Sequence, residues 1–275
     1  MQRVIAGIAA ATVIMSVTAS PAHAVPAAHV VAADPVTALK RQFVAGIGVR
    51  FTDVSTLIEF VGNTSFLKRT GSFQFGPAGM VASDVTATLN DEAIPRIPIS
   101  LVGMLRSKDR TIRIGTTSYY SGGPWAAPKG KTWLKHPHGM SAGWGGWCSQ
   151  LVNVAEAATL KALITRGKRT GRTYAGAISF GALEKVSPWL RNATMVKMSA
   201  DTKAAVLRFR LTVGADQLPQ RLVTDYPAST HGGVAAGEEG RRISVETNYT
   251  GWGNRVNIKA PPASEVAVIK RARLG

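Results

Sequence analysis

The strongest constraint on the fold is a regular alternation of apolar and polar residues in the C-terminal half of the chain. Alternation with a period of two indicates a strand with one buried and one wet face. It runs from Ala205 to Val213, returns over Leu218–Tyr226 after a turn, and appears again over Arg242–Tyr249. Its apolar residues include Leu207, Phe209, Leu211, Ile243 and Val245. The pattern predicts an antiparallel sheet that covers something apolar.

The rest of the chain adds further strands and a few helices. Less regular strands are expected over 49–60, 66–75, 80–89, 111–120 and 256–259. Short helices are expected over 36–42, where Asp34-Pro35 is a start signal, and over 182–190. The most convincing helix follows Asn153 and Glu156, which have the spacing of a capping box. Its apolar face would carry Ala157, Leu160, Leu163 and Ile164.

About ten strands with few helices, and no regular strand–helix alternation, indicate an α+β fold with an antiparallel sheet. One amphipathic helix is too little to fill the concavity of so long a curved sheet. An apolar cavity larger than roughly 300 Å³ is therefore expected between sheet and helix, and such cavities bind ligands. The residues expected to line it are Leu160, Leu163, Leu207, Phe209, Leu211, Ile243 and Val245.

The N-terminal segment has the features of an export signal. Arg3 precedes the apolar run Val4–Val17, and Ala22-His23-Ala24 is the small-x-small pattern of a signal peptidase site. The run is shorter than the roughly 20 residues of a spanning helix, and no cysteine for lipid attachment follows it. We predict a secreted protein without a lipid anchor. Its expected parts are a signal peptide (1–24, cleaved after Ala24), a flexible linker (25–36), one domain (37–262) and a basic tail (263–275).

The chain carries 33 Lys and Arg against 16 Asp and Glu, a formal charge of +17 at pH 7. For an exported protein the anionic counterparts are lipid headgroups and wall polymers rather than nucleic acid. Four cations that are close in sequence are expected to dock on such surfaces: Arg166, Lys168, Arg169 and Arg172. The alternative is a solvated face that only keeps the protein soluble.

A hydrolase motif lies in the middle of the chain without its usual surroundings. Gly139-Met140-Ser141-Ala142-Gly143 matches the nucleophile elbow G-x-S-x-G, with Asp216 or Asp225 and then His231 in the required order. That chemistry needs Ser141 on a strand-to-helix turn. The following sequence, Trp144-Gly145-Gly146-Trp147, does not start a helix. We therefore expect no catalytic residues.

The remaining candidates for chemistry are isolated. A single cysteine, Cys148, excludes an internal disulfide and a cysteine-based metal cage. His136-Pro137-His138 has no carboxylate nearby to complete a metal site, and Gly130-Lys131-Thr132 lacks the first glycine of a phosphate-binding loop. No cofactor and no metal are expected.

Four of the six tryptophans lie in one glycine-rich stretch: Trp125, Trp133, Trp144 and Trp147. Such rings either form a platform for sugars or a lip over a cavity, or they pack as ordinary core. Trp144 and Trp147 are the candidates for the lip or for stacking at the surface.

Several stretches together resemble a known family. They are Arg69–Gly76 (RTGSFQFG), Gly130–Trp133 (GKTW), Gly214–Arg221 (GADQLPQR), and Trp252-Gly253 followed by Val256–Pro262 (VNIKAPP). Over about residues 36–262 the chain resembles actinobacterial exported proteins related to the LolA-like lipoprotein carriers and the mycobacterial LppX-type lipoproteins. The resemblance implies a curved antiparallel half-barrel wrapped over helices, an apolar cavity, and a lipid or acylated cargo. It marks no catalytic residue, and the lipid-attachment cysteine of the anchored members is missing.

Three functions remain open from the sequence. The first is a non-enzymatic binder or carrier of lipid or acylated cargo. The second is a glycan-binding or structural protein of the cell envelope, and the least favoured is a serine hydrolase that uses Ser141. The identity of the cargo, the partner proteins and the oligomeric state are not encoded in any recognisable motif.

Overall fold

In the computed structural model, all described residues belong to one compact unit, 32–275. The described residues are 34–60, 62–97, 102, 108–124, 127–146, 148–193, 197–230 and 240–268. The expected signal peptide, Trp147, His231 and the cationic end of the tail lie outside them.

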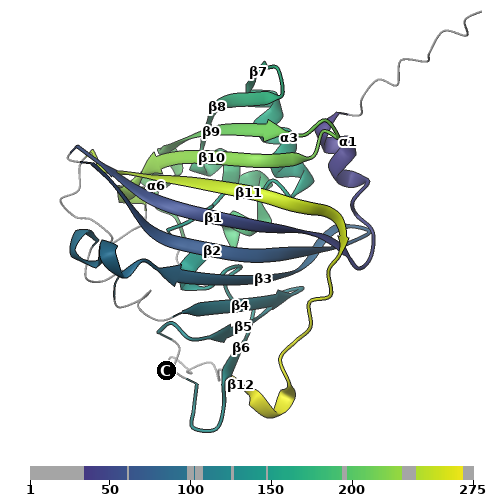
Figure 1. The fold of residues 1–275 in the computed structure, drawn as a ribbon, viewed down its shortest axis with the longest axis vertical. Coiled ribbons are helices and arrows are strands. Elements are labelled where there is room, and N and C mark those ends of the chain that lie inside the picture. The colour runs from purple at the N-terminus through teal and green to yellow at the C-terminus, as the bar shows by residue number, and fades with distance from the viewer. Residues whose placement is uncertain are drawn as a thin grey trace, which may run out of the picture. The chain divides into compact units, whose positions relative to one another are not determined.

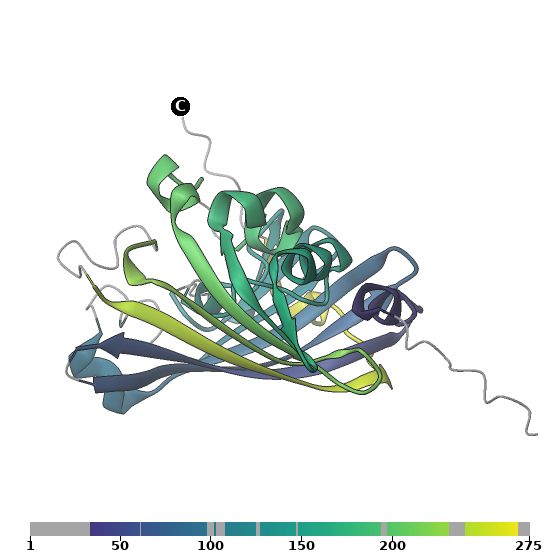
Figure 2. The ribbon, with the colours of Figure 1, turned by 90° about the horizontal axis from the view of Figure 1, so that it is seen from above.

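The fold is built on one strongly curved sheet, which contains twelve strands within the described residues (Figures 1 and 2). The first half of the chain supplies β1 (Ile47–Glu59), β2 (Gly62–Gly76), β3 (Gly79–Leu89), β4 (Asp109–Ile114), β5 (Thr117–Ser121) and β6 (Trp133–Pro137). The second half supplies β7 (Lys168–Thr170), β8 (Thr173–Ser179), β9 (Val206–Val213), β10 (Pro219–Pro227), β11 (Arg242–Arg255) and β12 (Val266–Val268). The order is β12-β6-β5-β4-β3-β2-β1-β11-β10-β9-β8-β7.

Two antiparallel meanders join at the middle of this sheet. Strand β1 pairs with β2 on one side and with β11 on the other, so that Asp53 lies opposite both Arg69 and Thr247. All neighbouring strands are antiparallel except β12, which runs parallel to β6. The predicted curved antiparallel sheet is confirmed, with twelve strands in place of about ten.

Some predicted strand boundaries are wrong. The expected strand over 111–120 is the hairpin β4–β5, because Gly115 turns the chain with a positive φ of 57°. No strand forms over 256–259. Instead, Val256 N donates to Gly46 O and Ile258 N donates to the side-chain oxygen of Gln74. The segment expected to be the start of a basic tail contributes β12 to the sheet.

Short helices lie on the concave side of the sheet (Figure 2). The α-helices are α1 (Pro35–Lys40), α3 (Ala157–Arg166), α4 (Phe180–Val186), α5 (Pro188–Arg191) and α6 (Ala200–Ala204). The 3₁₀ turns are η1 (Asp91–Arg96), η2 (Trp144–Gly146), η3 (Ala228–Thr230) and η4 (Ala263–Glu265). None of the helices among the described residues has the length and apolar character needed to cross a membrane.

The helix signals in the sequence have mixed outcomes. Asp34 caps α1 as expected, since its carboxylate accepts hydrogen bonds from Val36 N (2.9 Å) and Thr37 N (3.2 Å). The capping box before α3 does not form, because Asn153 instead accepts from Ala155 N. The helix expected over 182–190 is divided into α4 and α5 at Ser187-Pro188, since proline starts a helix more readily than it continues one.

We use the name cover for the irregular segment 139–156 together with α3, α4 and α5. Apart from Trp144 and Glu156, which are half-buried, every described residue of the segment 140–156 is buried. Buried irregular chain is uncommon because its backbone groups need partners. Here Ser141 N donates to Asn192 O (2.7 Å) and Gly145 N donates to the carboxylate of Asp109 (2.8 Å).

Candidate functional site: the concave face of the sheet

Most of the concave face is apolar. The inward side chains of β9 and β11 pack with the apolar face of α3 in a single core cluster, as the alternation predicts. The residues brought together are Leu160, Leu163, Leu207, Phe209, Leu211, Ile243 and Val245. Gly167 and Gly176 lie close to the Phe209 ring, since a methyl group added to either would be about 3.0–3.4 Å from its atoms.

Between the sheet and the cover, the described residues do not enclose the large cavity that the sequence predicts. The pocket that the described residues leave there has a volume of about 10 Å³, which is room for a single water molecule. The prediction is wrong because it counted only one helix, whereas α4, α5 and the segment 139–156 also fill the concavity. In this arrangement the predicted wall residues are core residues.

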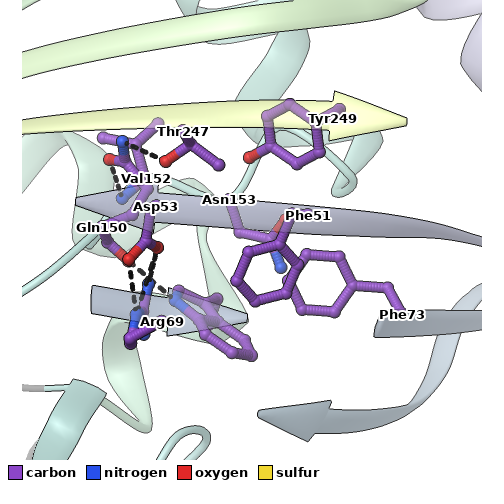
Figure 3. Close-up of a pocket in the computed structure, with 10 residues that line it drawn as sticks. Phe51, Asp53, Arg69, Phe73, Gln150, Val152, Asn153, Thr247 and Tyr249 are labelled. Atoms are coloured by element: carbon purple, nitrogen blue, oxygen red, sulfur yellow. Dashed lines mark hydrogen bonds and ion pairs between the residues drawn. The ribbon is translucent and has the colours of Figure 1, made fainter. Parts of the chain in front are cut away.

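The small pocket lies where the concave face becomes polar (Figure 3). Asp53 on β1 and Arg69 on β2 form a buried ion pair, in which the guanidinium Nε and Nη2 donate to the carboxylate at 3.1 and 2.5 Å. The Arg69 guanidinium also lies 5.8 Å from the centre of the Phe51 ring. Burial raises the pKa of Asp53, and the charge of Arg69 opposes that rise.

Gln150 fastens the cover to the sheet beside this pair. Its side-chain amide donates to Thr247 Oγ1 (3.0 Å) and accepts from Thr224 Oγ1 (3.1 Å). The preceding residue accepts a hydrogen bond from the hydroxyl of Tyr226 through its backbone oxygen (2.9 Å). These bonds connect the cover to β10 and β11 at a few points within an otherwise apolar contact.

Glu156 ties the parts of the cover to each other. Its carboxylate accepts from Ser187 Oγ (2.6 Å), Thr159 Oγ1 (2.8 Å) and Trp189 N (2.7 Å). It therefore connects the start of α3 to the start of α5. Burial raises the pKa of this carboxyl group, while its hydrogen bonds pull the pKa down.

The G-x-S-x-G motif belongs to the cover and has a structural explanation. A side chain at Gly139 would collide with the Tyr120 hydroxyl, and one at Gly143 would collide with Thr111 and Asp109. The glycines thus permit close approach to β4 and β5, and Ser141 Oγ donates to the backbone oxygen of Trp189 (3.2 Å).

The other members of the hydrolase pattern do not join Ser141. Asp225 forms an ion pair with Arg242 on the outer face of the sheet, and Asp216 lies in the turn between β9 and β10. Within the described part of the chain, no group of three or more His, Cys, Asp or Glu side chains can hold a metal ion. Burial raises the pKa of the Cys148 thiol to about 12, so this thiol is unreactive at neutral pH.

Of the two tryptophans expected at a lip or a stacking surface, Trp144 lies among the described residues and Trp147 lies outside them. Trp144 is half-buried and packs against the core cluster, and Trp133 is buried on the outer face beneath Arg110, whose guanidinium is 5.6 Å from its ring. Trp189, in the cover, makes an edge-on contact with Phe73 (5.3 Å between ring centres). Its place in the core was not predicted, since a lone tryptophan in a short helix carries no positional signal.

The predicted cationic residues lie at one end of the sheet and are all exposed; we call Arg166, Lys168, Arg169 and Arg172 the edge cluster. The cluster spans the end of α3, the edge strand β7 and the following turn. Lys168 lies opposite Ala175, which lies opposite Arg210, so the positive charge continues over the outer face of β8 and β9.

The outer face of the sheet is polar and has larger hollows than the inner face. Three of them have volumes of about 430, 310 and 420 Å³. Threonine, serine and charged side chains line most of these hollows, among them Arg50, Lys68 and Lys108. They are open surface grooves of the kind that suits polar partners rather than acyl chains.

No protein-family model matches the sequence, and no curated protein matches it. A LolA superfamily protein from Nitrosomonas europaea has 6% sequence identity, and the alignment covers 83% of this chain and 93% of that one with a TM-score of 0.32. The structure of EF1p2_mFAP2b bound to DFHBI has 12% identity, coverage of 76% and 95%, and a TM-score of 0.18. With TM-scores this low, what the chain binds has to be inferred from its own residues.

Proposed function

We propose that this protein is a non-enzymatic binder or carrier of lipid or acylated cargo, which it takes up between the concave face of the sheet and the cover. One observation carries the proposal. A continuous apolar sheet face is covered by separate short elements, of which the longest helix has 10 residues. Helices this short are unstable alone and depend on their contact with the sheet.

In the observed arrangement the site is closed, because only about 10 Å³ remains in the pocket between the sheet and the cover. Uptake therefore requires the cover to separate from β9–β11. Separation exposes apolar surface on both sides, at about 25 cal/mol per Å². An acyl chain in the gap offsets this cost, since each buried CH₂ contributes about 0.8 kcal/mol. The hydrogen bonds of Gln150 and the bond from the Tyr226 hydroxyl to the backbone oxygen of Ser149 are polar contacts that must break or shift.

The proposal also includes where the protein acts and how it docks there. Export by the signal segment 1–24, with cleavage after Ala24, brings the mature chain to an extracytoplasmic membrane or wall. The edge cluster then docks it on an anionic surface without a lipid anchor.

The closed site gives a direct test of the proposed uptake. Gln150 and Thr247 are replaced by cysteine in a Cys148→Ala background, and a short bis-methanethiosulfonate cross-linker joins the cover to β11 through two disulfide bonds, with release of sulfinate. A fluorescent fatty acyl probe should bind the uncoupled protein, fail to bind the cross-linked one, and bind again after a cleavable linker is cut. The matched control places the linker on the outer face, between Thr52 and Asn248, which are register partners.

Two results would overturn the proposed function. One is that the uncoupled protein binds no acyl probe and yields no lipid on organic extraction. The other is that the cross-linked protein binds the probe as well as the control does, since the cargo would then lie elsewhere.

A further inference from the structure

Among the apolar side chains of its first strands, the concave face carries a row of polar ones that the acyl-binding proposal does not use. Its side chains lie on β1–β4 and are buried: Asp53, Ser55, Arg69, Ser83, Asp109 and Thr111. We call these six residues the polar stripe. The strand register places them together, because Arg69 lies opposite Asp53 and, through Ala87, in line with Asp109.

Five atoms of the polar stripe are buried without a hydrogen-bond partner among the described residues. They are Ser55 Oγ, Arg69 Nη1, Ser83 Oγ, Asp109 Oδ1 and Thr111 Oγ1. In native proteins more than nine in ten buried polar groups are paired, so five unpaired atoms on four adjacent strands call for partners from outside the chain. The 10 Å³ pocket beside Arg69 holds at most one water molecule.

The chemistry of these atoms selects the partner. Arg69 keeps both N–H groups of Nη1 after its bonds to Asp53, and Asp109 keeps one oxygen after its bond to Gly145 N. The three hydroxyl groups can donate or accept. The two carboxyl groups of the stripe repel a carboxylate or phosphate on a ligand. The guanidinium of Arg69 repels an ammonium group. Uncharged hydroxyl groups, which both donate and accept, satisfy every member.

The part of the cover above the stripe leaves it largely unpaired. A side chain at Gly145 would collide with Ala87, and one at Gly143 would collide with Thr111, so bare backbone lies directly on the strands. Among the described residues, backbone at this distance hydrogen-bonds to the stripe at Asp109, from Gly145 N and from Trp144. When the segment that contains these glycines moves away, the unpaired atoms become the floor of the opened site.

We propose that the polar stripe receives an uncharged, hydroxyl-bearing head of the cargo, of the kind found in a monoacylglycerol, while the acyl chain lies along β9–β11. This inference rests on the proposed function. Strands β4 and β9 are six places apart in the sheet, or roughly 29 Å at the usual spacing. That is the length scale of a long acyl chain with its head group.

The test compares three lipids that share one oleoyl chain and differ only in the head: 1-monooleoylglycerol, oleate and oleoyl lysophosphatidic acid. Each displaces a fluorescent acyl probe from the wild-type protein. We expect monooleoylglycerol to bind about tenfold more tightly than the two anionic lipids, the effect of one or two paired hydroxyl groups.

Thr111→Val and Ser83→Ala then remove unpaired hydroxyl groups without removing any internal hydrogen bond. Each variant should keep or raise the melting temperature, while the affinity for monooleoylglycerol falls about five- to tenfold and that for oleate stays the same. Thr86→Val and Thr88→Val, on the outward side of β3, are the matched controls and should change neither affinity.

The outcomes separate the two proposals. Equal affinity for the three lipids, or an unchanged preference in the Thr111→Val and Ser83→Ala variants, overturns the head-group inference and leaves acyl binding in place. Failure of all three lipids to displace the probe, or of the probe to bind, overturns both.

Discussion

The buried pair Asp53–Arg69 gives the sharpest prediction about stability. Both side chains are almost completely inaccessible, at 0% and 1% exposure, and they bond to each other through two guanidinium nitrogens. Replacing Arg69 by methionine leaves the Asp53 carboxyl group in the core without its cation. Loss of one partner of a buried pair costs about 3–5 kcal/mol. For a domain of this size, each kcal/mol shifts the melting temperature by about 2–4 °C.

We therefore expect Arg69→Met to lower the melting temperature by about 6–20 °C. Combining it with Asp53→Leu should restore most of the loss or exceed the wild type, because a buried pair replaced by apolar side chains is often neutral or stabilising by about 1–4 kcal/mol. Calorimetry of the two single variants and the double variant gives the coupling between the two sites.

The exposed pair Arg110–Asp84 is the matched control, with two nitrogen–oxygen contacts of 2.9 and 2.7 Å. Arg110→Met should cost less than about 1 kcal/mol, since its side chain is 45% exposed. The reasoning would be refuted if the Asp53→Leu/Arg69→Met double variant lost as much free energy of unfolding as the two single variants together. The desolvation penalty would then be too small to cancel the attraction within the pair.

Three further predictions concern charge and chemistry. Burial raises the pKa of the carboxyl groups of Asp109 and Glu156, so the folded state binds their protons more readily than the unfolded state. Their contribution to stability is complete below the ordinary carboxyl pKa and is lost as the pH rises through the raised values. Between pH 7 and 5 the free energy of unfolding of the wild type should rise relative to that of Asp109→Asn, and parallel curves would contradict this. The edge cluster should give weak binding to anionic vesicles at low salt, at about 1 kcal/mol per cation, and none at 1 M salt, where the Debye length is about 3 Å. Equal sedimentation with neutral vesicles, or no effect of salt, would show that the charge only keeps the protein soluble. Ser141 should not react with a fluorophosphonate probe, because it is buried and donates to a backbone oxygen. Stoichiometric labelling at that serine, detected by mass spectrometry, would restore the hydrolase hypothesis.

The strands that the sequence predicts are those with a clear contrast between their two faces. In β9, arginines lie on the outer face and Leu207, Phe209 and Leu211 on the inner one, so the alternation is visible. Strand β8 escapes detection because its outward residues include Ala175 and Ala177 and its inward residues include Gly176. Small residues on both faces remove the contrast, although they fit the tight packing against α3.

The site could be predicted only in part for a related reason. The apolar wall follows from periodicity, and its residues lie in the same core cluster as the apolar face of α3. Whether that wall bounds a cavity depends on what else covers it, and the segment 139–156 has no period of two or 3.6 from which its position could be read. The polar stripe is equally hidden, because Ser83 and Thr111 look like ordinary outward residues of a strand until the register is known.

The composition of segment 139–156 explains both why it is unpredictable and how the site can open. Its glycines allow the backbone to lie directly on β3–β5, where any side chain at Gly139, Gly143 or Gly145 would collide. The same lack of side chains means that this part of the cover is held mainly by hydrogen bonds to β4 and β5. Gly139 O and Met140 O accept from Arg113 and Ser118, and Met140 N and Gly145 N donate to Tyr120 and Asp109. The contact of α3, which packs against β8, is different, since Leu160 and Leu163 bury whole side chains in the core cluster. Opening over the polar stripe therefore breaks hydrogen bonds that a hydroxyl-bearing head can replace, whereas opening over α3 exposes apolar side chains that an acyl chain can cover.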